Sequence, residues 1–200
     1  FEALATEDTQ GHSVAVGYQA LKTQNSSATS ENTAVGYAAL TGDTKGSKST
    51  AVGYRTLANQ NFTTSTDSHN TAIGNDAGLS VTTGQDNVII GSLAGDALTD
   101  ADRNTAIGRS ALTADTLGNR AVAIGFGTLQ TQNFTTATDN YNVAVGYNSG
   151  AATTTGSLNT LVGGLSGLAL TSGNNNTAVG YAALSTDTLG DRNVAVGASA

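Results

Sequence analysis

Few side chains in this sequence of 200 residues could do chemistry. The histidines are His12 and His69, and only Asp67-Ser68-His69 brings a carboxylate, a hydroxyl and an imidazole together. A catalytic triad is a spatial arrangement, and adjacent side chains in an extended segment point to opposite faces. Both histidines stand five residues before a recurring glycine, a position that Asp86 and Arg103 occupy in successive coils, where the two could pair. We interpret this position as a tolerant surface site and predict that the chain is not an enzyme.

Metal ligands are equally sparse. The chain has no cysteine, and the Gly-Gly-x-Gly-x-Asp pattern of calcium-binding β-rolls is missing. Asp43, Asp115 and Asp187 recur at the same place in every fourth repeat, which is too far apart along a regular stack for them to share an ion. The sequence therefore predicts neither a metal site nor a cofactor, and it assigns these carboxylates to turns or to solvated surface.

The dominant feature is a repeated motif, Asn-Thr-Ala-Val-Gly or a close variant. Its glycine, called here the motif glycine, occurs eleven times at nearly regular intervals. The motif glycines are Gly17, Gly36, Gly53, Gly74, Gly91, Gly108, Gly125, Gly146, Gly163, Gly180 and Gly197. So regular a period indicates a solenoid of stacked coils.

Each motif has the composition of a short strand. Val or Ile precedes the glycine, Thr or Val stands two residues earlier, and the position between them is Ala except at Ile89 and Leu161. β-Branched residues at alternate positions suit a pleated strand, whose side chains alternate between two faces. We expect the Thr/Val and Val/Ile positions to line the inside of the coil. The Ala positions would then form an outer face that another chain can approach closely.

Stacked strands of this kind predict an all-β fold, a parallel β-roll solenoid of about eleven coils of about 17–21 residues. At about 4.8 Å per coil, eleven coils form a rod roughly 50 Å long. Each coil should hold two strands and two turns, with the second turn near a glycine seven residues before the motif glycine. Gly46, Gly84, Gly118, Gly156, Gly173 and Gly190 occupy that place. Helix is not expected.

We interpret residues 1–200 as a single solenoid segment of a longer fibre, cut inside a repeat at both ends. Phe1-Glu2-Ala3-Leu4 fits the half-motif that follows a motif glycine, as in Tyr37-Ala38-Ala39-Leu40, and Gly197-Ala198-Ser199-Ala200 stops within it. One long interval between motif glycines followed by three short ones also recurs along the chain, which indicates duplication of a block of four coils.

Charge and composition exclude further classes. The formal net charge is −7 and the eight basic residues are scattered, whereas binding to nucleic acid needs clustered Lys and Arg. No apolar run is long enough to span a membrane.

Eight motifs begin with Asn, and stacked Asn side chains can form a hydrogen-bonded ladder between coils. These are Asn32, Asn70, Asn87, Asn104, Asn142, Asn159, Asn176 and Asn193.

Several motifs resemble those of a known family. Asn142-Val143-Ala144-Val145-Gly146 and Ala121-Val122-Ala123-Ile124-Gly125 are similar to the Ser/Asn-Val-Ala-Ile-Gly signature of YadA-like trimeric autotransporter head domains. The Asn-Thr-Ala-Val-Gly-Tyr repeats are also similar to those of phage tail fibres. This resemblance implies a left-handed β-roll, a homotrimer packed about a threefold axis, and an extracellular fibre of a bacterial surface or a virion that mediates attachment.

The two longest intervals, from Gly53 to Gly74 and from Gly125 to Gly146, carry the candidate contact residues for a host glycan or protein receptor. They contain aromatic and amide side chains within Thr-rich stretches, and elongated surface loops often carry binding functions. The candidates are Asn61, Phe62, Asn133, Phe134 and Tyr141. A phenylalanine in a longer turn can instead fold back onto its own coil, and the sequence leaves this alternative open.

An ice-binding β-solenoid is the alternative function, because regular columns of threonine on a flat β-face can order water. Against it, the Thr positions are interrupted by Val and, in the orientation expected above, face the core. The interruptions are Val14, Val88, Val122, Val143 and Val194.

Overall fold

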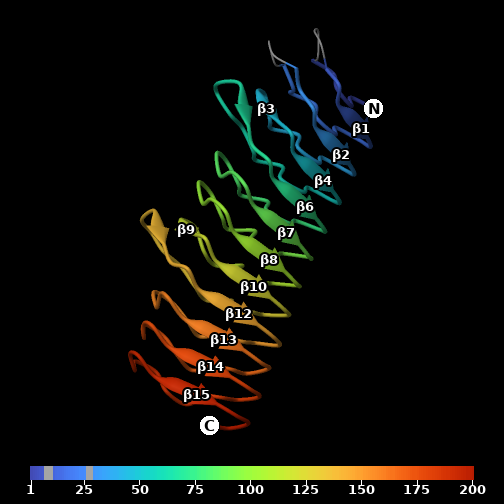
Figure 1. Ribbon diagram of the computed structural model, residues 1–200. Coiled ribbons are helices and arrows are strands. Elements are labelled where there is room, and N and C mark those ends of the chain that lie inside the picture. The colour runs from blue at the N-terminus through green and yellow to red at the C-terminus, as the bar shows by residue number, and fades with distance from the viewer. Residues whose placement is uncertain (7–10, 26–28) are drawn as a thin grey trace.

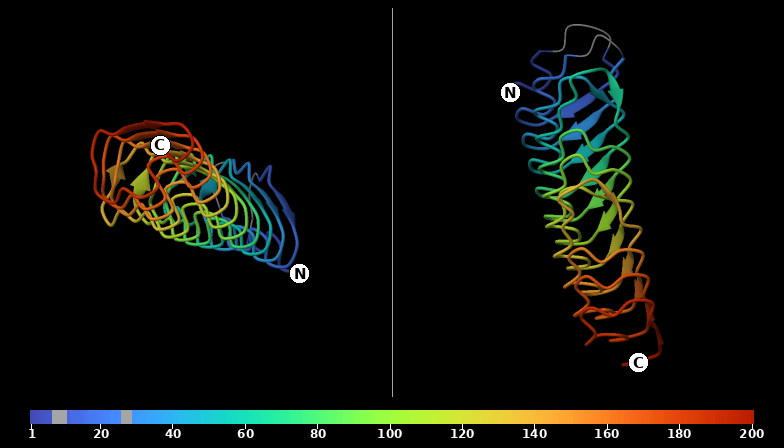
Figure 2. Two further views of the ribbon diagram at one scale, coloured as in Figure 1. Left: turned by 90° about the horizontal axis from the view of Figure 1, so that it is seen from below. Right: turned by 90° about the vertical axis from the view of Figure 1, so that its left-hand side faces the viewer.

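The computed structural model describes residues 1–6, 11–25 and 29–200. In this part of the chain there is no helix, and the protein is an all-β parallel solenoid of about eleven coils. The coils stack in chain order into a rod, with the two termini at opposite ends (Figure 1, Figure 2). The predicted fold class is confirmed at this level.

One parallel sheet of eleven strands runs the length of the rod, and each strand covers the three residues before a motif glycine. Neighbouring strands pair in register, so Ala34 lies opposite Ala51 and Ala51 opposite Ala72. The strands are β1 (Val14–Val16), β2 (Thr33–Val35), β4 (Thr50–Val52), β6 (Thr71–Ile73), β7 (Val88–Ile90), β8 (Thr105–Ile107), β10 (Val122–Ile124), β12 (Val143–Val145), β13 (Thr160–Val162), β14 (Thr177–Val179) and β15 (Val194–Val196).

The two faces of this sheet are reversed relative to our expectation. Side chains at the Ala position point into the coil and are fully buried from Ala34 to Ala178, whereas their Thr/Val and Val/Ile neighbours face outward and are half-exposed. The prediction that β-branched residues line the interior was wrong. In most coils a second layer of side chains, including Leu40 and Leu112, fills the interior from the wall opposite the sheet and leaves room only for alanine at the inward position.

The opposite wall is built from turns, so the prediction of two strands in every coil was also wrong. Residues two and four positions after the motif glycine adopt left-handed backbone, as at Ala38 (φ 54°) and Leu40 (φ 50°). Alternating left-handed residues interrupt the pleat of a strand. Backbone hydrogen bonds still join successive coils there, as from Leu40 to Thr56, which keeps this wall in register with the sheet.

The motif glycine is a backbone requirement of the stack. Gly108 has φ +129°, and a Cβ added to it would collide with the carbonyl oxygen of Gly125 in the next coil. The same relation joins each motif glycine from Gly17 to Gly180 to its successor. Only glycine combines this conformation with so close an approach of two backbones.

Buried asparagines form the ladder that the sequence predicts. The Oδ1 atom of Asn87 accepts a hydrogen bond from the backbone N–H of Asn104 at 2.9 Å, and its Nδ2 donates to the carbonyl of Ala101 at 2.8 Å. Asn159 makes the equivalent pair of bonds to Asn176 and Gly173. Each side chain thus joins its own coil to the next one.

The two coils with the longest intervals differ from the rest by a loop that reaches beyond the rod. In the first, β5 (Thr66–Asp67) pairs with β3 (Gly46–Ser47); in the second, β11 (Thr138–Asp139) pairs with β9 (Gly118–Asn119). Both loops project from the same long edge, on the left of Figure 1. The extra residues therefore extend the outline of the rod and leave its stack intact.

Candidate functional site

The structure separates the side chains of the one catalytic-looking cluster. Ser68 is fully buried, and its Oγ donates to the carbonyl of Ser47 at 2.7 Å. His69 is exposed and lies 3.6 Å from Asp86 of the next coil, while Asp67 pairs with Lys48 at 2.7 Å. The three side chains therefore have separate partners and do not form a triad with one another.

The recurring aspartates are structural. Asp43 is fully buried, where its Oδ1 accepts from the backbone N–H of Gly46 at 2.9 Å and its Oδ2 accepts from Gln60 at 2.8 Å. Burial raises the pKa of Asp43, and these hydrogen bonds oppose the rise only in part. Asp115 is likewise buried against Gly118, so for both residues the expected turn role holds and a solvated position does not.

Neither a metal site nor an enclosed pocket occurs among the described residues. No group of three or more His, Asp or Glu side chains in residues 1–6, 11–25 and 29–200 could hold a metal ion. The same residues form no pocket. In this part of the chain there is also no helix suited to crossing a membrane.

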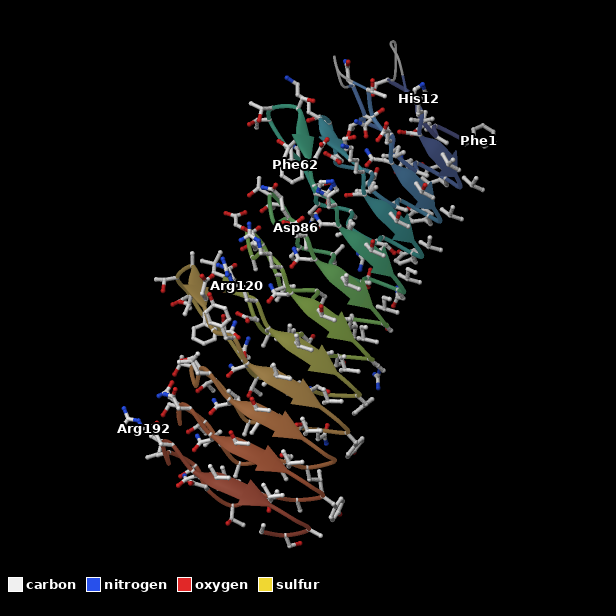
Figure 3. All side chains as sticks on the ribbon, viewed as in Figure 1. Phe1, His12, Phe62, Asp86, Arg120 and Arg192 are labelled. Carbon is white, nitrogen blue, oxygen red and sulfur yellow. The ribbon has the colours of Figure 1, made fainter. Side chains whose placement is uncertain are left out.

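The candidate contact residues divide into two groups. Phe62 and Phe134 are buried, with 4% and 8% of their surfaces exposed, so their rings pack onto the coil and cannot form a contact surface. Asn61, Asn133 and Tyr141 are exposed. Figure 3 shows Phe62 and Arg120 on the same long edge of the rod as the projecting loops.

Charged side chains follow this long edge. Asp86 lies between His69 and Arg103, at 3.6 Å and 3.7 Å, which confirms the contact expected between Asp86 and Arg103. Arg120 lies 3.2 Å from Asp139 and donates to the hydroxyl of Tyr141. Exposed ion pairs of this kind contribute at most about 1 kcal/mol to stability. The charged side chains of this edge are therefore solvated and add little to the stability of the fold.

The most extensive candidate surface is the outer face of the eleven-stranded sheet. It consists of one column of Thr and Val and one column of Val and Ile, all uncharged and at least partly exposed. We call these two columns the outer sheet face. The second column comprises Val16, Val35, Val52, Ile73, Ile90, Ile107, Ile124, Val145, Val162, Val179 and Val196.

Aromatic rings line one border of the outer sheet face, directly after the motif glycines. Tyr18, Tyr37 and Tyr54 stack in succession with ring centroids 5.2 Å and 5.1 Å apart. Phe126 and Tyr147 form a second stack at 5.6 Å. These rings pack against one another between coils but stay about half-exposed, so they widen this surface.

Comparisons with known proteins add no assignment: no family model, no curated protein and no solved structure matches this chain. The geometry of the described residues is therefore the basis on which a function can be argued.

Proposed function

We propose that this chain is a segment of a homotrimeric extracellular fibre, of a bacterial surface or a virion, that mediates attachment. The supporting observation is the outer sheet face, which leaves β-branched side chains such as Ile73 (40% exposed) and Val179 (37% exposed) in contact with water along the whole rod. Contiguous apolar surface of this extent is rare on monomeric proteins and marks interaction sites.

A second copy of the chain is the occupant that fits this face. The face repeats once per coil, at about 4.8 Å, so an identical chain offers columns of the same spacing and length. Its two columns are uncharged, whereas the ion pairs lie elsewhere: those of Asp86 and Arg120 on the long edge with the loops, and that of Arg55 and Asp76 after the motif glycines. Threefold symmetry and left-handed coiling are the forms that the family resemblance implies. The expected packing surface moves from the Ala positions to the Val/Ile positions.

Attachment would then rest with the surface that assembly leaves free. The loops of the two longest coils project from the long edge on which Asp86 lies (Figure 3), and Asn61, Asn133 and Tyr141 of these coils are exposed. Three copies would repeat these groups around the fibre. Weak contacts to a glycan or protein receptor gain avidity when they are multiplied in this way.

The solution mass of the chain tests this proposal. Light scattering on a sizing column should give three times the chain mass of 19.9 kDa. Ile73→Lys should yield a folded monomer because it places a charge in the outer sheet face. Leu158→Lys is the matched control, since Leu158 is also apolar and 50% exposed. It stands five residues before a motif glycine, the position that Asp86 and Arg103 occupy on the long edge, and so lies outside the outer sheet face. A monomer at all concentrations, or equal dissociation of both variants, would contradict the proposal.

A second candidate, an ice-binding solenoid, gains support from the same face. Thr33, Thr50 and Thr71 point outward in register, so the objection that they face the core no longer applies. Columns of hydroxyl and methyl groups at fixed spacing are suited to a periodic water layer. Because both candidates need this face, a stable monomer with thermal hysteresis that Thr105→Lys abolishes would favour ice binding over the fibre.

A further inference from the structure

Two tripeptides in the projecting loops match the acceptor sequence for Asn-linked glycosylation, Asn-x-Ser/Thr with x other than Pro. They are Asn61-Phe62-Thr63 and Asn133-Phe134-Thr135, one in each of the two longest coils. Two further matches occur in the chain. Asn175-Asn176-Thr177 lies at the start of β14, and Asn25-Ser26-Ser27 lies largely outside the described residues.

Backbone geometry presents the two reactive side chains of each loop tripeptide together. Asn61 and Thr63 are exposed, whereas Phe62 between them is 4% exposed. In the second loop Asn133 and Thr135 are exposed around a buried Phe134. The buried phenylalanine thus anchors each tripeptide, while the amide and the hydroxyl on either side of it remain exposed.

Each acceptor amide is held by its oxygen. The Thr44 hydroxyl shares its proton between Oδ1 of Asn61 at 2.7 Å and the carbonyl oxygen of Phe62 at 2.9 Å. The Thr116 hydroxyl shares its proton in the same way between Oδ1 of Asn133 at 3.0 Å and the carbonyl oxygen of Phe134 at 2.9 Å. Neither Nδ2 atom has a hydrogen-bond partner in the described part of the chain. The nitrogen that a glycosyltransferase would use therefore stays open to solvent in both loops.

The tripeptide at Asn175 provides a contrast within the same molecule. Its middle residue, Asn176, belongs to the buried ladder and bonds to Asn159 and Gly190. Its hydroxyl residue, Thr177, is part of β14 in the eleven-stranded sheet. An enzyme that engages this tripeptide would have to disrupt both features.

From these observations we infer that Asn61 and Asn133 are acceptor sites for Asn-linked glycans. In the reaction, Nδ2 of the asparagine forms a bond to the anomeric carbon of a sugar activated by a nucleotide or lipid phosphate. The bond from that carbon to the phosphate oxygen breaks, and the amide proton passes to a base of the transferase. The inference is independent of the proposed oligomeric state, because both loops lie outside the outer sheet face.

Peptide mass spectrometry of the protein purified from its native source tests the inference. Peptides that contain Asn61 and Asn133 should carry sugar, and the peptide that contains Asn175 should not. Bare asparagine at both loop positions, or equal modification of Asn175, would overturn it.

A purified transferase provides the matched variants. The folded chain, treated with an asparagine-directed glucosyltransferase and UDP-glucose, should gain two hexoses by intact mass. Thr63→Ala and Thr135→Ala should each remove one hexose, whereas Thr63→Ser should retain both. Failure of the folded chain to react, while a synthetic Asn-Phe-Thr peptide reacts under the same conditions, would contradict the exposed geometry on which the inference depends.

Discussion

Leu161 occupies the space that a larger residue at position 167 would need. A Cβ placed on Gly167 would lie 2.8 Å from Cδ2 of Leu161, and one placed on Gly150 in the preceding coil would lie 2.8 Å from its Cδ1. Ile89 lies beside Gly78 and Gly95 in a looser version of this arrangement, with its Cδ1 3.0 Å and 3.5 Å from the added Cβ positions. The two exceptions to Ala in the motif thus fill the gaps that glycine leaves in the opposite wall, where other coils have leucine.

This complementarity predicts coupled effects on stability. Leu161→Ala should cost about 2–5 kcal/mol because it leaves a cavity, and Gly167→Leu should also destabilise because it overfills the site. The double variant should lose less stability than the two single variants lose together. Its alanine and leucine then stand at the positions that Ala106 and Leu112 occupy in their own coil. Urea unfolding of the four proteins measures the coupling. Strict additivity would show that the two positions do not compete for space.

Removal of a ladder asparagine should be costly. Asn159→Ala leaves the N–H of Asn176 and the carbonyl of Gly173 without their side-chain partner in a buried site. Each unpaired buried group costs about 1–3 kcal/mol, so we expect a loss of about 2 kcal/mol or more in the free energy of unfolding. Asn75→Ala, at an exposed position, should stay within about 0.5 kcal/mol. Equal losses for the two variants would refute the ladder as a source of stability.

The motif glycine should not tolerate even alanine. Gly108→Ala combines a left-handed backbone with a collision against Gly125, so we expect a loss of about 3 kcal/mol or more in stability. Gly164→Ala is the control, because the nearest atom to its added Cβ is 3.6 Å away on the Tyr181 ring. Thermal unfolding monitored by circular dichroism distinguishes them. A normal melting temperature for Gly108→Ala would mean that the coils can shift apart.

The buried carboxylate of Asp43 should oppose stability at neutral pH. Burial raises its pKa in the folded chain, so the folded state binds this proton more tightly than the unfolded state. Its contribution is therefore most favourable below about pH 4, the ordinary range of Asp, and is lost as pH rises through the raised pKa. Asp43→Asn should flatten the pH profile of unfolding in that window.

The contribution of Asp100 to stability should depend on pH in the opposite direction to that of Asp43. Hydrogen bonds from the Thr82 and Thr83 hydroxyls lower its pKa, so its contribution is present above about pH 4 and is lost as pH falls through the lowered value. Asp100→Asn should thus flatten the profile on the acidic side. Identical pH profiles for the two variants would be inconsistent with these assignments.

Much of the fold could be predicted because each coil repeats the same local demands. The interval between motif glycines fixes the number of coils, and the alternation around Ala34 or Ala51 identifies each strand. The Asn ladder also follows from the spacing. Alternation defines two faces of a strand but does not say which faces inward when both are apolar, and here the opposite wall decides.

The candidate site was harder to predict for the same reason. The outer sheet face consists of residues such as Ile73, whose composition suits a core equally well. The sequence suggested Phe62 as a contact residue because it is an aromatic residue in a long loop, but in the structure its side chain is buried. One usable signal was missed: Ile89 and Leu161 replace Ala only next to coils with glycine in the opposite wall, which marks the Ala position as internal.

The packing of Ile89 and Leu161 also determines how such a rod can change in evolution. Ile89 depends on glycines in two consecutive coils, Gly78 and Gly95, and Leu161 on Gly150 and Gly167. Loss or gain of a single coil at these places would leave a bulky side chain facing leucine, or a void facing alanine. A block of four coils carries its own complementary neighbours, so recombination that exchanges whole blocks keeps each of these bulky residues beside its glycines. The length of the rod can then change by one such block without separating Leu161 from its glycines.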